Sequence, residues 1–395
     1  MRSSTTILIT DGEHRAALAA TRSLGRAGYR VIVASSRRRS LAGASRWTAA
    51  SWHTPDPLED PAGFVSMLEQ RAAHSEFQVL LPITDQSIVP ILSARPRFPA
   101  VVIPFPELET WRRISDKAAL TQAAVQLEIR VPEQAILIGP DQVSLAERIG
   151  FPVVAKPARS LVETRDGPAK FSVRHARNAV ELKAALDRLP SEAWPVLIQR
   201  RIVGPGMGVF LLMDQGRVLA CFGHRRILEK PPSGGVSVCS ESVELSRELL
   251  QRSASLLEHF AWSGVAMVEY KLDRETRVPY LMEVNGRLWG SLQLAIDAGV
   301  DFPRLLVDHA VGRPVNAPQS WATGLRCRWR LGEADHLLAR LRQRTDTLPP
   351  DIPPLSTAIK HVLLPAWGPN QRGEVFRWND PRPAFREALD WIQGR

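Results

Sequence analysis

Short apolar runs and helical patterns alternate over the first part of the chain. Residues 5–10 form an apolar run that predicts a strand, residues 14–27 place small apolar side chains on one helical face, and residues 29–34 form a second apolar run. Gly28 marks the end of the helix between the two runs. The order strand, helix, strand predicts a βαβ unit in which the two strands are parallel.

The turn that follows the first predicted strand contains one glycine, Gly12. A dinucleotide-binding turn would need the pattern GxGxxG, so NAD binding is not predicted here. After a loop over residues 45–61 and a helix, residues 78–82 form another predicted strand, and Asp85 follows its carboxyl end. Ligands of open α/β sheets gather at that edge, which makes Asp85 a candidate contact for a second substrate. The structural alternative is an aspartate that caps a helix or a turn.

The middle of the chain has a different pattern. After a strand at residues 100–103, Asp116 is placed to cap a helix that begins at Lys117. Strands are then predicted at residues 134–137, 151–156 and 195–199, and helices at residues 141–149 and 179–189. Residues 204–271 are mostly strand-like, apart from a helix at residues 244–260 with leucines at helical spacing. Beyond residue 312 the chain is rich in proline, arginine and tryptophan.

Composition limits the classes of protein that the chain can form. With 395 residues and 44% hydrophobic side chains, it can fold as two or three domains with well-formed cores. The net charge of +10 is compatible with anionic ligands, but the arginines lie in small scattered clusters without interleaved aromatic residues. We therefore predict no nucleic-acid partner.

Targeting signals and cysteine usage point to the cytosol. The first residues show no convincing leader peptide, and no apolar run is long enough to cross a bilayer, so we predict a cytoplasmic protein without a membrane partner. The three cysteines, Cys221, Cys239 and Cys327, show no CxxC spacing. This spacing argues against a disulfide framework and against a zinc site.

Most of the candidate chemistry lies in residues 263–287, where SGVAMVEYK and VPYLMEVNGR predict two strands joined by a turn. Because side chains alternate along a strand, Glu283, Asn285 and Arg287 share one side. The turn sets Glu269 directly opposite Glu283. Facing carboxylates repel each other unless a cation lies between them, and all-oxygen ligands suit magnesium held partly by substrate phosphates. A solvated hairpin with a charged face is the structural alternative.

Four spaced elements, in the same order, resemble the ATP-grasp superfamily, the fold of biotin carboxylase, D-alanine:D-alanine ligase and the carbamoyl-phosphate synthases. They are the pair Asp116-Lys117, the stretch FPVVAKP that contains Lys156, the stretch VLIQRRIVGPG and the stretch MEVNGR. The resemblance covers roughly residues 5–312, and the pattern ExNxR in the last stretch is its most specific signal. A further segment, GHRRILEKPPSGGVSVCSESV, resembles a block in a little-characterised subgroup of carboxylate-amine ligase-like members.

The resemblance implies an α/β fold of the ATP-grasp type, with a Rossmann-like N-terminal domain followed by two α+β lobes that enclose the nucleotide. The corresponding boundaries are residues 1–113 for the N-terminal domain, 114–200 for the small, nucleotide-binding lobe, and 201–316 for the large lobe with the metal and substrate site. We expect residues 317–395 to form a C-terminal appendage of unknown role.

The resemblance also implies which residues bind ATP. Lys117 and Lys156 would contact its phosphates, since a lysine is a point charge suited to phosphate groups. Gln199, Arg200 and Ile202 would form the hinge between the lobes, where the backbone of Arg200 and Ile202 would meet the adenine edge. The structural alternative for each lysine, taken singly, is an ordinary exposed charge. The alternative for the hinge is the end of a strand before a Gly-Pro-Gly turn.

The same resemblance implies a metal site and a catalytic group. Glu269, Glu283 and Asn285 would bind magnesium, with manganese as the alternative, and the metal would bridge the ATP phosphates. Arg287 would stabilise charge on the transferring phosphoryl group.

A substrate-binding segment is implied as well. Arg225 and Arg226 follow a predicted strand, and one of them should point into the cleft, where a guanidinium can hold a carboxylate or an acyl phosphate. Ser233, Gly234 and Gly235 would lie near the substrate, because glycines permit close approach of the backbone. A flexible hairpin with solvated arginines is the structural alternative.

One stretch departs from the family pattern. Where members usually carry a glycine-rich loop over the phosphates, this chain has ARSLVETRDGPAKFSV with Gly167 alone. Fewer flexible amides would face the phosphates, and Arg159, Arg165 or Lys170 would neutralise phosphate charge instead.

Three functions remain open on the sequence alone. The leading hypothesis is an ATP-dependent carboxylate-amine ligase that forms an amide or peptide bond through an acyl phosphate and releases ADP and phosphate. One alternative is an ATP-binding module without ligase activity, which the glycine-poor loop favours. The other is a kinase-like enzyme that stops at phosphorylation of a small substrate. We expect a small carboxylate and an amine as partners, and the dimers common in the superfamily make a homodimer a further expectation.

Overall fold

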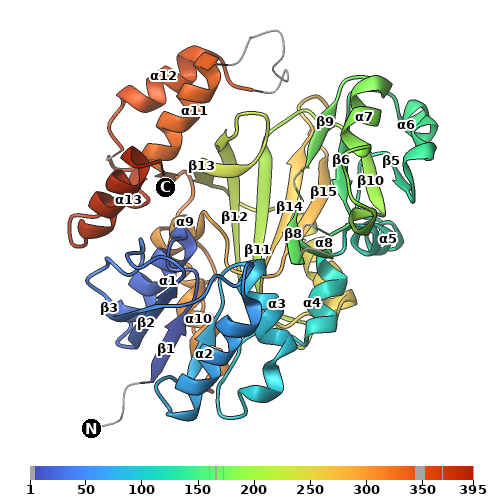
Figure 1. Cartoon of the computed structure of the whole chain (residues 1–395). Helices are drawn as coiled ribbons and strands as arrows, with labels where there is room; N and C mark the ends of the chain where they lie inside the picture. Colours follow the sequence, from blue (N-terminus) through green and yellow to red (C-terminus); the bar gives the residue numbers. More distant parts are fainter. Residues whose placement is uncertain are drawn as a thin grey trace.

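The computed structural model describes residues 5–159, 161–164, 167–171, 173–342, 352–366 and 368–394. Figure 1 shows an N-terminal α/β part, a small lobe, and a long central sheet between them. Arg165, which the sequence offered as a phosphate contact, lies outside the described residues.

The N-terminal part builds a four-stranded parallel sheet in the order β3-β2-β1-β4. Its strands are β1 (Thr6–Ile9), β2 (Arg30–Ser35), β3 (Thr48–His53) and β4 (Val79–Leu81). Its helices are α1 (Arg15–Arg26), α2 (Pro61–Ala73), α3 (Asp85–Ser93) and α4 (Leu108–Ser115), with a 3-10 turn η1 (Arg95–Arg97). The predicted βαβ unit is confirmed, since β1 and β2 are parallel neighbours joined by α1.

Two features of this part differ from the sequence prediction. Strand β3 lies within the stretch expected to be a loop, because its residues TAASWH lack apolar alternation although they pair with β2 at the sheet edge. The strand expected at residues 100–103 is reduced to a single bridge between Val79 and Val102. Pro104 follows directly and has no N–H group with which to continue a ladder.

The small lobe contains a four-stranded antiparallel sheet in the order β5-β10-β6-β9, which has a hydrophobic core of its own around Leu137, Val153 and Ile198. Its strands are β5 (Gln134–Leu137), β6 (Val153–Pro157), β9 (Arg174–Ala176) and β10 (Val196–Arg200). Its helical segments are η2 (Pro140–Gln142), α6 (Ser144–Ile149), α7 (Ala179–Leu186) and η3 (Ser191–Ala193).

Two further elements border the small lobe. Helix α5 (Lys117–Gln126) leads into it and is capped by the Asp116 side chain, which accepts from two backbone N–H groups of the first turn, as the sequence predicted. A separate hairpin, β7 (Leu161–Thr164) and β8 (Gly167–Lys170), lies in the glycine-poor stretch that departs from the family pattern in the sequence.

The large lobe is a seven-stranded sheet in the order β15-β14-β11-β12-β13-β16-β17. The five strands that precede the C-terminal segment are β11 (Gly206–Asp214), β12 (Arg217–Lys230), β13 (Val236–Ser242), β14 (Gly264–Leu272) and β15 (Pro279–Asn285). The helices are α8 (Arg247–His259), α9 (Leu292–Asp297) and α10 (Phe302–Ala310). The two strands predicted within residues 263–287 are therefore present as β14 and β15.

The last two strands of this sheet come from the segment that was expected to form an appendage. β16 (Arg326–Arg328) pairs with β13, and β17 (Gln371–Gly373) pairs with β16, so the segment completes the large sheet. Strands of three residues are too short to show an alternation, which is why the sequence pattern missed them. The accompanying helices, coloured orange to red in Figure 1, are α11 (Arg330–Arg342), α12 (Leu355–Leu363) and α13 (Arg382–Ile392). Across the described ranges, no helix has the length and apolar content needed to cross a membrane.

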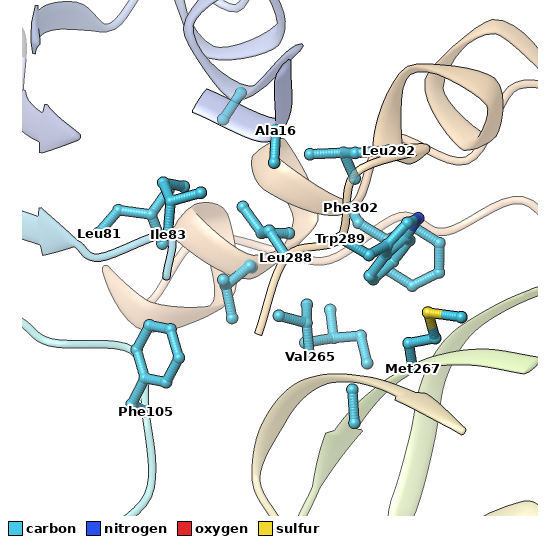
Figure 2. Close-up of a cluster of buried hydrophobic side chains, with 14 of the residues drawn as sticks. Ala16, Leu81, Ile83, Phe105, Val265, Met267, Leu288, Trp289, Leu292 and Phe302 are labelled. Atoms are coloured by element: carbon cyan, nitrogen blue, oxygen red, sulfur yellow. The ribbon is translucent and has the colours of Figure 1, made fainter. Parts of the chain in front are cut away.

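One hydrophobic core joins the N-terminal part to the large lobe. In Figure 2, Ala16 of α1 and Ile83, just after β4, lie near Leu288, while Trp289 lies against Phe302. These side chains are all buried. Because close-packed interiors resist deformation, the shared core holds α3 at a fixed position relative to the end of β15.

Candidate active site

The β14–β15 hairpin places Glu269 directly opposite Glu283, in the register predicted from the sequence. Two residues beyond Glu283, the Asn285 side-chain amide donates to Glu283 Oε1 at 3.1 Å. Arg287 follows at the same spacing, and its Nη2 donates to Asn285 Oδ1 at 3.1 Å. Strand β15 ends at Asn285 and Arg287 lies in the turn that follows, so the row of polar contacts continues beyond the end of the strand.

Two lysines from other elements act on Glu283. Lys117 begins α5 and is 5% exposed, and its Nζ lies 3.8 Å from Glu283 Oε2. Burial tends to raise the pKa of Glu283, but the charges of Lys117 and Lys156 and the hydrogen bond from Asn285 outweigh it and lower the pKa to about 2. Glu283 is therefore a carboxylate throughout the physiological pH range.

Lys156, on β6, is half-buried, and its hydrogen-bond partner is uncharged. Its Nζ donates to Gln199 Oε1 at 2.9 Å, and Gln199 Nε2 in turn donates to Gln134 Oε1 at 2.8 Å. Burial lowers the pKa of Lys156 to about 8, although the charge of Glu283 opposes the shift. The ammonium group is met at hydrogen-bond distance by an amide oxygen, which suits a site that receives an anionic group from a ligand.

The predicted hinge lies at the end of β10. Gln199 is 1% exposed, and its side chain holds Lys156 rather than facing solvent. The Arg200 N–H donates to the Glu133 carbonyl at 2.8 Å, so an adenine edge would have to use the Arg200 carbonyl and the Ile202 amide. The sequence predicts Gln199 only as part of the hinge, and in the structure its side chain also contacts Lys156, a candidate phosphate-binding residue.

Arg226, on β12, reaches Glu269 across the intervening strand β11. Its guanidinium contacts Glu269, donates to Glu229 Oε1 at 2.8 Å, and donates to the Gly235 carbonyl at 3.2 Å. Burial tends to lower the pKa of Arg226, but Glu269 and Glu229 outweigh it and raise the pKa. The path across β11 is open because Gly206 lacks a side chain, and a Cβ there would lie 2.9 Å from Arg226 Cδ.

Of the two arginines that the sequence offered, the structure brings only Arg226 to the carboxylates. Arg225 donates to Glu241 Oε1 at 2.7 Å, and Arg326 donates to Glu241 Oε2 at 2.5 Å. Successive strand residues point to opposite faces, so Arg225 lies apart from Glu269 and is not placed to act on a ligand there.

Asp85, the first residue of α3, meets Arg287 from the large lobe. Arg287 Nε donates to Asp85 Oδ1 at 2.8 Å. Burial tends to lower the pKa of Arg287, but Asp85, with a contribution from Glu283, raises it. Asp85 was expected to contact a substrate, and in the structure it orients the candidate catalytic arginine.

Ser233, Gly234 and Gly235 lie between β12 and β13. Gly234 has a φ of +127°, a conformation that residues with side chains rarely adopt. A Cβ on Gly235 would lie 2.4 Å from the Lys230 carbonyl oxygen, so this glycine serves the turn itself rather than the approach of a ligand. The turn touches the site through the Gly235 carbonyl, which accepts from Arg226.

A cavity of about 310 Å³ opens beside the carboxylates. Its walls combine cations, carboxylates and apolar side chains from the N-terminal part, the small lobe and β15. The lining residues are Asp85, Val89, Trp111, Arg112, Ser115, Lys117, Leu120, Arg159, Val162, Glu283, Val284, Asn285 and Gly286. Arg159, one of the residues expected to neutralise phosphate charge, lines this cavity and forms an ion pair with Asp116 at 3.2 Å. Mixed walls of this kind suit a small polar organic ligand.

The acidic side of the site fits a hard divalent cation. Glu269 and Glu283 offer carboxylate oxygens, and Asn285 offers an amide oxygen, which is the donor type that magnesium prefers. Burial raises the pKa of Glu269, Arg226 opposes the shift, and the nearby Glu283 reinforces it. A cation between the two carboxylates would relieve this repulsion.

A second cluster with metal-ligand chemistry, Cys239, Glu333 and His361, does not fit a metal. Glu333 already accepts from Arg328 at 2.8 Å and from Arg330 at 3.0 Å. Burial raises the pKa of Cys239 to about 12, so its thiol stays neutral. A metal there would face two guanidinium groups and an uncharged sulfur.

Comparison with solved structures supports the fold. The chain is similar to a biotin carboxylase–beta-gamma-ATP complex from Campylobacter jejuni (18% identity, 82% of this chain and 74% of that chain, TM-score 0.65). It is also similar to the L-amino acid ligase from Bacillus licheniformis (17% identity, 79% and 75%, TM-score 0.61). A third match is the biotin carboxylase domain dimer of the 2-oxoglutarate carboxylase from Hydrogenobacter thermophilus, in complex with MgADP (15% identity, 82% and 74%, TM-score 0.62). At these identities the likeness establishes an α/β ATP-grasp fold, with a parallel N-terminal sheet and mainly antiparallel sheets after it.

A family model matches the part of the chain that carries the carboxylates. Residues 192–332 match the family described as ATP-grasp in the biosynthetic pathway with Ter operon. This range includes β10, all of the β14–β15 hairpin, and Arg287. The fold is that of ATP-grasp proteins, as the sequence motifs predicted, and the segment with the two carboxylates matches an ATP-grasp family model.

Proposed function

We propose that this chain is an ATP-dependent carboxylate-amine ligase, which forms an amide or peptide bond through an acyl-phosphate intermediate. The observation that carries the proposal is the facing pair Glu269 and Glu283 with Lys117 and Lys156 beside it. Carboxylates that bind a divalent cation, together with lysines that bind phosphate oxygens, are what phosphoryl transfer from ATP requires. The similarity to an L-amino acid ligase supports the choice of reaction.

The nucleotide and the metal would be held by separate sets of groups. Lys117 and Lys156 would bind phosphate oxygens, and the backbone of the hinge after Gln199 would meet the adenine, through the Arg200 carbonyl and the Ile202 amide. Magnesium or manganese, which neutralises phosphate charge when bound, would be held by Glu269, Glu283 and Asn285.

The reaction needs positioning and charge neutralisation rather than a nucleophilic side chain. An oxygen of the substrate carboxylate would attack the γ-phosphorus, the bond from that phosphorus to the bridging oxygen would break, and ADP would leave with the electron pair. The amine would then attack the acyl carbon, the C–O bond to phosphate would break, and inorganic phosphate would leave while the nitrogen loses a proton. Arg287, oriented by Asp85, would stabilise charge on the transferring phosphoryl group.

The test is magnesium-dependent ADP release by the full chain with pools of amino acids, small carboxylates and amines, followed by mass spectrometry of the products. We expect turnover that needs two pooled substrates and yields a condensed mass. Glu283→Ala should lower the rate about 100-fold or more, because the metal that neutralises the phosphate charge would lose a ligand. Glu275→Ala, at the exposed turn of the same hairpin, is the matched control and should keep the parental rate. ADP release by Glu283→Ala at the parental rate would refute the site.

One observation favours the alternative of an ATP-binding module without ligase activity. Arg226 contacts Glu269, so a metal at this carboxylate has to compete with a guanidinium group. ATP binding without turnover in any pool would support the module. ADP release that needs one organic substrate and leaves a stable phosphorylated product would support the kinase-like alternative.

A homodimer and a cytoplasmic location stay predictions. The 2-oxoglutarate carboxylase domain to which the chain is similar is described as a dimer. Sedimentation of the full chain with and without MgADP would measure the oligomeric state directly.

A further inference from the structure

A second cavity, of about 280 Å³, lies between the first turns of α2 and helix α3. It adjoins the active-site cavity at Val89 and Arg112, which line both. Asp85 and Val89 are four residues apart on α3 and therefore lie on the same face, with Asp85 at the active-site cavity. The two cavities are therefore neighbouring compartments along one helix, with Val89 and Arg112 at their border.

The second compartment differs from the first in its chemistry. Leu58, Pro61 and Val65 give it apolar walls, and no aspartate or glutamate is among its described lining residues. Arg112, exposed on α4, stands where the compartments meet, and among the described residues its guanidinium has no hydrogen-bond or ion-pair partner. Along α3, a cavity with charged groups of both signs is thus followed by Arg112 and then by a mainly apolar compartment, whose other cation, Arg97, is paired with Glu69.

We infer that the amine substrate is an α-amino acid with an apolar side chain, and this inference rests on the ligase function proposed above. Its amino group lies in the active-site cavity, which is lined by Glu283 and Asn285 of the candidate metal site, so that it can reach the acyl phosphate formed there. Its α-carboxylate is held by Arg112, because a guanidinium binds a carboxylate in two parallel hydrogen bonds. Its side chain fills the compartment between α2 and α3, where apolar surface leaves water.

This orientation agrees with the chemistry of the second half-reaction. The ammonium group first gives one proton to solvent, and the free amine attacks the acyl carbon of the acyl phosphate. The new C–N bond replaces the C–O bond, phosphate leaves with the electron pair, and the nitrogen loses a second proton. The α-carboxylate of the amino acid takes no part in these steps, so a permanent cation such as Arg112 can hold it from start to finish.

The test is calorimetric binding of L-phenylalanine and of L-phenylalaninamide to the full chain saturated with MgADP. We expect the parent to bind phenylalanine about tenfold or more tightly than the amide, which lacks the carboxylate. Arg112→Gln should remove that preference. Arg113→Gln, which takes the same charge from the same helix on the side that faces Phe260, is the matched control and should keep it.

The apolar compartment is tested separately by filling it. Ala62 is an exposed residue that lines this compartment, so Ala62→Trp should weaken phenylalanine binding about tenfold or more without touching the core. Ala73→Trp, at the exposed far end of the same helix, is the matched control and should bind as the parent does.

The outcomes separate this inference from the ligase proposal. MgADP binding with no heat from phenylalanine, leucine or methionine up to millimolar concentrations would overturn the inference alone. Equal affinity of the parent for phenylalanine and its amide, or unchanged binding by Ala62→Trp, would also overturn it. Failure of the parent to bind MgADP would overturn both, because the amine site has a role only beside a bound nucleotide.

Discussion

Removal of the Arg226 side chain is the sharpest perturbation of the candidate site. Arg226→Ala deletes the contact with Glu269, the 2.8 Å hydrogen bond to Glu229 and the 3.2 Å hydrogen bond to the Gly235 carbonyl. Both carboxylates remain, each with a side chain that is only 14% exposed. Removing one partner of a buried ion pair costs about 3 to 5 kcal/mol, because the other charge stays buried without compensation.

We expect the lower end of that range, about 3 kcal/mol, because Glu269 can take up a proton. Burial already raises the pKa of Glu269, and loss of Arg226, which opposes that shift, raises it further. A carboxyl group with a raised pKa binds more protons in the folded chain than in the unfolded chain. The stability loss therefore grows as the pH rises through that pKa, and Arg226→Ala should be less destabilised at about pH 5 than at about pH 8.

The assay is denaturant unfolding followed by tryptophan fluorescence, with and without magnesium. Magnesium should stabilise Arg226→Ala more than the parent, because it can replace the missing positive charge beside Glu269. Arg225→Ala, the neighbour on the same strand, should cost less than about 1 kcal/mol, because Arg225 is 40% exposed and Arg326 stays on Glu241. Equal losses in the two variants, or an equal effect of magnesium on Arg226→Ala and the parent, would refute the reasoning.

Three further perturbations have expected outcomes. In the parent, MgADP affinity should fall as the pH rises through about 8, because Lys156 loses its proton there, and Lys156→Arg should remove that fall. Calorimetry on either side of pH 8 measures the affinity. An affinity of the parent that does not change with pH would exclude Lys156 from the phosphate site. Asp85→Asn should lower turnover about tenfold or more and leave MgADP affinity unchanged, because it weakens the 2.8 Å contact that orients Arg287. Steady-state rates measure the turnover, and calorimetry measures the affinity. Gly235→Ala should lower the melting temperature, because its Cβ would lie 2.4 Å from the Lys230 carbonyl oxygen. Gly139→Ala should not lower it, because Gly139 has a φ of −165° and no atom lies within 4 Å of the added Cβ. Equal melting temperatures of the two variants would contradict the role given to Gly235.

The hairpin of the site could be predicted because everything that determines it is local. Glu269 and Glu283 lie on strands joined by a short turn, so alternation along the two strands fixes their register. The start of α5 at Lys117 is local in the same sense, since the preceding Asp116 caps the helix.

The contact between Arg226 and Glu269 could not be predicted in this way. It depends on the sheet order β14-β11-β12, which brings together strands that are not neighbours in sequence. A signal was present, because Gly206 and Gly208 occupy alternate positions of β11 and remove side chains from the face between β12 and β14. Without the sheet order, these glycines indicate only a turn. Which of Arg225 and Arg226 points towards Glu269 likewise depends on the sheet order, because the two side chains lie on opposite faces of β12. The compartment between α2 and α3 forms only when these helices pack together, so the sequence pattern does not show it.

The core shared by the N-terminal part and the large lobe also determines which parts of the chain depend on each other for their packing. A break at residue 113 would expose Leu288, which lies near Ile83 in the shared core, and would take Asp85 away from Arg287. The small lobe, in contrast, has a hydrophobic core of its own. Substitutions on α3 and at the end of β15 therefore have to be compatible with each other, whereas the core of the small lobe can change without disturbing the shared core.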